Sequence, residues 1–209
     1  MDLIQPLFLN QSGRTETAEL GVANSSWSQT FIFDVIQKDI DKGVDSFLLF
    51  IKPEEKTWTP DWNYQAEMVA KIKKQFPKIQ LIVDVCLCST LPDGHCRVMD
   101  KPDTSEALLI NLGKKLESAG ADILAPSDMG ENTVQNLKAE TDCEVMAYVK
   151  YRSVFYSSFR NLADSTPTTE RTYQLPINGD SGMIATANKF RSQKADYLLL
   201  KPAQHSLND

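Results

Sequence analysis

Short apolar segments alternate with longer amphipathic segments along the chain. The apolar segments are nearly continuous in Ile, Val, Leu and Phe and are bounded by turn residues, a pattern typical of strands buried on both faces of a parallel sheet. The pattern predicts six strands, at residues 3–9, 46–51, 79–85, 122–125, 144–150 and 196–200.

The amphipathic segments predict helices between these strands. Residues 31–42 keep their apolar side chains on one face and stop at Gly43, a residue suited to a helix C-terminus. Four more helices are predicted at 63–75, 105–119, 133–139 and 182–191. Residues 161–180 show little periodicity and predict a long loop. Strand–helix alternation of this kind predicts a parallel α/β fold, either a doubly wound sheet or a (β/α)8 barrel.

Polar residues at the predicted strand ends favour the barrel. They comprise residues 84–88, Ser127, Asp128, Lys150 and Lys201. A barrel assembles its site at the C-terminal ends of several strands. Six strands are fewer than the eight of a closed barrel, and 209 residues are fewer than the typical length of about 250. We therefore expect a TIM-barrel-like chain with about six β/α units, forming a single domain over residues 1–209.

The composition limits the classes of partner. Hydrophobic residues make up 42% of the chain and charged residues 24%, which suits a globular domain with a sizeable core. The net charge of −6 and the lack of a basic run argue against nucleic acid. No apolar run reaches the roughly 20 residues of a membrane span, and the first residues do not have the pattern of a signal peptide. A cytoplasmic protein without membrane contact is expected.

Three of the four cysteines, Cys86, Cys88 and Cys96, lie within eleven residues. The first two stand two positions apart at a predicted strand end, so both can point to one side, and the following loop can return the third. Three thiolate ligands leave a fourth position open, as catalytic zinc does. The alternative is three buried or loop cysteines without a metal. His95 is either a fourth ligand or a neighbour that forms hydrogen bonds.

Lys150 and Lys201 each follow an apolar run. Burial at a strand end lowers the pKa of a lysine, and a second ammonium group nearby lowers it further. The neutral amine can then attack a ketone and form a Schiff base. The alternative is that each lysine reaches solvent at the end of its strand.

Arg160 immediately precedes the predicted loop, and Arg171 lies within it. Arginines on a loop of this length can clamp a substrate carboxylate while the loop acts as a lid. The alternative is two ordinary solvated arginines.

Several segments together resemble the zinc-type porphobilinogen synthase (5-aminolevulinate dehydratase) family. They are LIQPLFL, DVCLC with GHC, LAPSDM, VMAY with Lys150, FYSSFR, TYQLP and ADYLLLKP, and they occur in the family order. The resemblance implies a (β/α)8 barrel and a lyase that condenses two molecules of 5-aminolevulinate into porphobilinogen, in tetrapyrrole and heme biosynthesis.

The resemblance also implies roles for individual residues. Lys201 and Lys150 would form Schiff bases with substrate, and Cys86, Cys88 and Cys96 would hold Zn2+. The resemblance further implies substrate-binding roles for seven residues: Asp84, Ser127, Tyr156, Phe159, Arg160, Arg171 and Gln174.

The chain departs from the family pattern at several places. Glu170 stands where the family has an arginine, and Gly130 to Thr133 replace a family M-D-G-R sequence. The sequence has no counterpart of the family's last two strand–helix units. The family's N-terminal arm is also nearly absent from it. We therefore expect a homo-oligomer smaller than the family octamer. The departures also leave two alternatives open: a relative acting on another amino ketone or keto acid, and a non-catalytic zinc-binding scaffold or regulatory protein.

Overall fold

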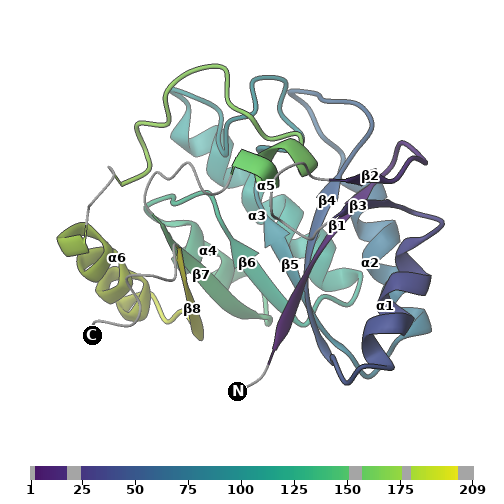
Figure 1. Cartoon of the computed structure of the whole chain (residues 1–209). Helices are drawn as coiled ribbons and strands as arrows, with labels where there is room; N and C mark the ends of the chain where they lie inside the picture. The colour runs from purple at the N-terminus through teal and green to yellow at the C-terminus, as the bar shows by residue number, and fades with distance from the viewer. Residues whose placement is uncertain (1–2, 18–24, 151–156, 176–179, 202–209) are drawn as a thin grey trace.

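The computed structural model describes residues 3–17, 25–150, 157–175 and 180–201, without the side chains of 157–159, 180 and 181 (Figure 1). The described strands form one sheet in the order β2-β3-β1-β4-β5-β6-β7-β8. All neighbouring strands are parallel except β2 and β3, which are antiparallel. The strands are β1 (Ile4–Asn10), β2 (Glu16–Thr17), β3 (Ser25–Ser28), β4 (Ser46–Lys52), β5 (Gln80–Val85), β6 (Ile123–Pro126), β7 (Glu144–Lys150) and β8 (Tyr197–Lys201).

Helices cover one face of this sheet (Figure 1). They connect consecutive parallel strands, as expected for a (β/α)8-type chain. A short helix, α5, lies instead across the end of the sheet at which the parallel strands finish. The helices are α1 (Ile32–Ile40), α2 (Asn63–Gln75), α3 (Pro102–Ser118), α4 (Thr133–Glu140), α5 (Ser157–Leu162) and α6 (Asp180–Ser192). None of the helices in the described part of the chain is long and apolar enough to cross a membrane.

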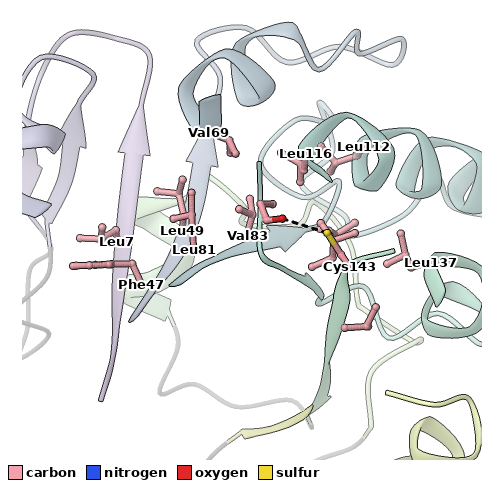
Figure 2. Close-up of a cluster of buried hydrophobic side chains, with 14 of the residues drawn as sticks. Leu7, Phe47, Leu49, Val69, Leu81, Val83, Leu112, Leu116, Leu137 and Cys143 are labelled. Atoms are coloured by element: carbon pink, nitrogen blue, oxygen red, sulfur yellow. Dashed lines mark hydrogen bonds between the residues drawn. The ribbon is translucent and has the colours of Figure 1, made fainter. Parts of the chain in front are cut away.

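The period of two along each strand divides the apolar residues between two cores. In β4, Phe47 and Leu49 face the helices, whereas Leu48 faces the opposite, concave side of the sheet with Phe50 packed against its cluster. Figure 2 shows the larger core, in which strand residues meet side chains from the covering helices. The fourth cysteine, Cys143, belongs to this core, where its thiol lies 3.3 Å from the carbonyl oxygen of Ala121.

The structure confirms the six predicted strands and the five predicted helices with small shifts at their ends. The predicted strand count is wrong, because β2 and β3 add two strands beyond β1. The sequence of β3, SSWS, contains no apolar run, and β2 has only two residues. Helix α5 was also not predicted, because its six residues are too few for a periodic pattern.

Candidate active site

A cavity of about 110 Å3 lies at the C-terminal ends of the parallel strands, under α5 and the loop that follows it. Parallel strands finish at one edge of a sheet, so residues far apart in the sequence meet there. Nine of the residues predicted for the site line this cavity: Asp84, Cys88, Cys96, Ser127, Lys150, Arg160, Arg171, Gln174 and Lys201. Tyr156 and the side chain of Phe159 lie outside the described residues, so their implied substrate-binding roles stay predictions.

The two lysines are direct neighbours across β7 and β8. Lys150 is the register partner of Lys201, so both side chains leave the sheet on the same side. Tyr148, two residues before Lys150, shares this face and forms the floor between them. The Nζ atoms of Lys201 and Lys150 lie 4.7 and 5.8 Å from the centre of the Tyr148 ring. The pair is therefore fixed by the register of the sheet.

The two amines differ in pKa because their surroundings differ. Burial, with the positive charge of Lys150, lowers the pKa of Lys201 to about 8, and Asp84 opposes the shift. Burial also acts to lower the pKa of Lys150, but the nearby cysteines, led by Cys96, and Asp84 together raise it. Lys150 is thus the amine beside the cysteines, and Lys201 carries the larger neutral fraction at neutral pH.

Cys86, Cys88 and Cys96 form one cluster, as their spacing predicts. Their three sulfur atoms lie within 4.8 Å of one another, and the Sγ atoms of Cys86 and Cys88 are 3.2 Å apart. Hydrogen bonds from the thiols of Cys86 and Cys88 hold the pKa of Cys96 well below its usual value. The cluster lies at the end of β5, with Cys86 and Cys96 buried and Cys88 half-buried, and can hold a metal ion.

His95 does not join this cluster. Its Nδ1 atom lies 3.1 Å from the hydroxyl of Tyr173, and its Nε2 atom lies 2.8 Å from the hydroxyl of Thr169. The backbone N–H of Cys96 donates to the same Tyr173 hydroxyl, at 3.1 Å. Of the two possibilities for His95, the structure supports the neighbour that forms hydrogen bonds. Tyr173 therefore joins the loop after α5 to the loop between β5 and α3, residues 86–101, which we call the cysteine loop.

Gly94 brings the same two loops into contact. Its φ of +69° is in the left-handed region, and a Cβ atom there would overlap the backbone carbonyl of Thr166. Nearby, the backbone N–H of Thr168 donates to the carbonyl of Asp93, at 2.9 Å. We call residues 163–175 the covering loop. It is attached to the cysteine loop by both backbone and side-chain contacts.

Two buried polar atoms on the cavity side have no hydrogen-bond partner within the described residues: Asp84 Oδ1 and the Tyr148 hydroxyl. Burial raises the pKa of Asp84 to about 7, while a hydrogen bond with Ser127 and the charges of the two lysines act to lower it. Buried polar atoms are normally satisfied. Their position between the lysines and the cysteines suits a polar ligand.

Sequence reasoning missed Phe8, Phe50, Lys52 and Tyr148, which also line the cavity. The Phe8 and Phe50 rings are stacked, with centroids 4.9 Å apart. The alternation in each strand was the available signal, because it places Phe50 and Lys52 on the same side of β4. Among the described residues, five basic side chains and one carboxylate, that of Asp84, line the cavity, so this lining favours an anionic ligand. The basic residues are Lys52, Lys150, Arg160, Arg171 and Lys201.

Sequence reasoning also missed an ion pair behind the cysteine loop. Arg97 Nη2 lies 3.3 Å from the buried carboxylate of Asp128, which also accepts a hydrogen bond from Thr133 at 2.9 Å. Asp128 follows Ser127 at the end of β6, so this pair holds the cysteine loop against the next strand. The segment 130–133 contains no arginine, and the guanidinium paired with Asp128 comes from Arg97.

Comparison with known proteins shows the family to which the chain belongs. A family model described as delta-aminolevulinic acid dehydratase matches residues 1–208. The chain belongs to the delta-aminolevulinic acid dehydratase family. The family's members are lyases, and two relatives of that name, from Halalkalibacterium halodurans and Bacillus subtilis, are each 30% identical over 97% of the chain.

Solved structures agree with this membership. The delta-aminolevulinic acid dehydratase of Toxoplasma gondii, solved with its reaction product porphobilinogen, superposes with a TM-score of 0.88 and 27% identity over 98% of this chain. The carboxyl transferase domain of Rhizobium etli pyruvate carboxylase, at 12% identity and a TM-score of 0.55, shares the fold alone. The expected TIM-barrel-like α/β fold is therefore confirmed.

The match covers only part of each dehydratase relative. The chain spans 67% and 68% of the two bacterial relatives and 65% of the Toxoplasma gondii chain.

Proposed function

We propose that this chain carries out the zinc-dependent, Schiff-base condensation of two 5-aminolevulinate molecules to porphobilinogen. One observation carries the proposal: two neighbouring lysines share a basic cavity with Cys88 and Cys96, two members of the cysteine cluster. Family membership indicates 5-aminolevulinate as the substrate. The geometry provides two lysine amines, one for the ketone of each substrate molecule.

The lysines would act as nucleophiles. A neutral amine attacks the ketone carbon, a C–N bond forms, and the ketone oxygen leaves as water, giving an iminium that withdraws electrons from the adjacent carbon. The pKa of Lys201 is lowered to about 8, chiefly by burial, so an appreciable fraction of this amine is neutral at pH 7. Lys150, its register partner, would hold the second substrate beside the cysteines.

The cysteine cluster fits zinc by the chemistry of its donors. Cys86, Cys88 and Cys96 would hold the ion, because three thiolates and one open position are a ligand set of catalytic zinc. Bound there, zinc would polarise an oxygen or position an amine of the substrate nearest Lys150.

The remaining residues would bind and orient the substrates. Arg160, Arg171 and Gln174 come from α5 and the covering loop, and their donors suit a carboxylate. Asp84 and Ser127 are hydrogen-bonded to each other between the lysines and the cysteines. With a pKa raised to about 7 by burial, Asp84 can hold and return a proton near the reacting amines.

The test is covalent trapping. The purified protein is incubated with 5-aminolevulinate and borohydride, which reduces an iminium to a stable secondary amine, and the adduct is mapped by mass spectrometry. We expect adducts on Lys201 and Lys150. K201A and K150A should each remove the corresponding adduct and porphobilinogen formation, whereas K78A, at an exposed turn lysine, should change neither. Turnover that survives K201A would refute the assignment.

We further infer that the chain forms a homo-oligomer smaller than an octamer. Within the described residues, β8 pairs with β7 alone and forms one edge of the sheet. A second chain would cover such an edge. Sedimentation equilibrium tests the inference, and a monomer mass at all concentrations would contradict it.

A further inference from the structure

Lys52 is the last residue of β4 and lines the cavity. Phe50, two residues earlier, lies on the concave side of the sheet against the cluster there. Side chains two residues apart in a strand point to the same side, and Lys52 is about 6.6 Å farther along the strand. Lys52 therefore stands directly above Phe50, at the mouth of the cavity.

Phe50 connects this position to Lys201. The Nζ atom of Lys201 lies 5.8 Å from the centre of the Phe50 ring, across the concave face from β8. A molecule bonded to Lys201 Nζ and extending toward the mouth thus passes over Phe50 and arrives at Lys52.

The other cations belong to the opposite part of the cavity. Arg171 is two residues from Tyr173, which accepts a hydrogen bond from the backbone of Cys96. Burial and the charge of Arg171 lower the pKa of Arg160, while Cys96 and Cys88 act to raise it, so Arg160 lies near the cysteines. The two arginines therefore serve the half that contains Lys150 and the cysteines. The half that contains Lys201 has aromatic walls, and its cation at the mouth is Lys52.

We propose that Lys52 binds the carboxylate of the keto acid that is joined to Lys201, and so selects acidic ketones for that half of the cavity. The inference rests on the proposed Schiff-base function and adds a specificity residue to it. An ammonium group at the mouth and an amine at the floor fix the two ends of a short keto acid. The ketone is then held against Lys201 Nζ in one orientation.

The experiment combines one substitution with two ligands. Levulinic acid carries a ketone and a carboxylate, and its methyl ester carries the same ketone without the charge. Borohydride trapping on Lys201 is titrated with each ligand in the unmodified protein, in K52M and in K38M. Lys38 is an exposed lysine of α1, so K38M controls for loss of a positive charge elsewhere.

We expect K52M to weaken half-maximal trapping of levulinic acid about tenfold, the loss of one charge-assisted hydrogen bond, and to leave trapping of the ester unchanged. K52R should restore the preference for the acid in part, and K38M should behave like the unmodified protein. Normal trapping of the ester also shows that K52M is folded.

Other outcomes separate the two proposals. An adduct on Lys201 with an acid-to-ester preference that K52M leaves intact overturns the role of Lys52 while the Schiff-base function stands. Equal weakening of both ligands by K52M also overturns it, because the effect would then be structural. The absence of any ketone adduct on Lys201 in the unmodified protein overturns the proposed function itself, and the role of Lys52 with it.

Discussion

Replacing Tyr173 by phenylalanine removes one oxygen atom that joins two loops. That oxygen accepts a hydrogen bond from the backbone N–H of Cys96 and pairs with Nδ1 of His95, each at 3.1 Å. One arrangement satisfies every group: the tyrosine hydroxyl donates to Nδ1, and the Nε2–H of His95 donates to Thr169 at 2.8 Å. The ring of phenylalanine keeps the apolar packing, so Y173F isolates the hydrogen bonds.

The expected cost follows from the groups left behind. Cys96 and His95 are 5% and 1% exposed, so water has little access to the abandoned partners. An orphaned buried donor costs about 1–3 kcal/mol, and a lost ordinary hydrogen bond about 0.5–1.5 kcal/mol. We expect Y173F to lower the free energy of unfolding by about 2–3 kcal/mol. Because the bond positions a proposed zinc ligand, we also expect zinc affinity to fall about tenfold or more.

Chemical denaturation measures the first effect, and competition with a chromophoric chelator measures the second. Y197F is the matched control, since the Tyr197 hydroxyl contacts Glu144 at the surface. It should cost less than about 0.5 kcal/mol and leave zinc affinity unchanged. A Y173F protein as stable as Y197F, with unaltered zinc affinity, would show that the covering loop does not support the cysteine cluster.

Three further predictions concern the amine, a glycine and the metal. The rate of ketone trapping on Lys201 should rise as the pH rises through about 8, because burial lowers the pKa of this ammonium group and the neutral form gains; a rise centred near 10.5 would contradict the burial argument. G94A should cost roughly 2 kcal/mol more than G13A in thermal or chemical unfolding, because both residues have positive φ but only Gly94 faces a backbone carbonyl. Elemental analysis should find about one zinc per chain, which C96S should lose and C143S, altered in the hydrophobic core, should retain.

Most strands of the sheet, and where they end, can be predicted from the local sequence. Apolar runs mark β1 and β4–β8; the strands from β4 to β7 are largely buried, whereas β8 at the edge of the sheet is only half-buried. The short polar strands β2 and β3 give no such signal, since pairing with a neighbour rather than burial of an apolar face makes them strands. The same holds for α5, which the tertiary structure places over the cavity.

Some features of the candidate site can likewise be predicted from the local sequence, and others depend on the fold. Cys86 and Cys88 are close because they are close in sequence, and Lys150 and Lys201 are recognisable because each ends an apolar strand. Which lysine lies beside the cysteines depends on the order of strands in the sheet. Lys52 ends a strand in the same manner, but its relation to Lys201 requires the curvature that brings β4 opposite β8.

The pairing of Lys150 with Lys201 has a consequence for engineering. The register between β7 and β8 sets the backbone positions from which the two amines extend. Loops at this edge can therefore be exchanged to admit other ketones without moving the reactive pair. A slip of one residue in the register would instead turn one of the amines toward the helices, so the pair forms only when these two strands are aligned correctly during folding.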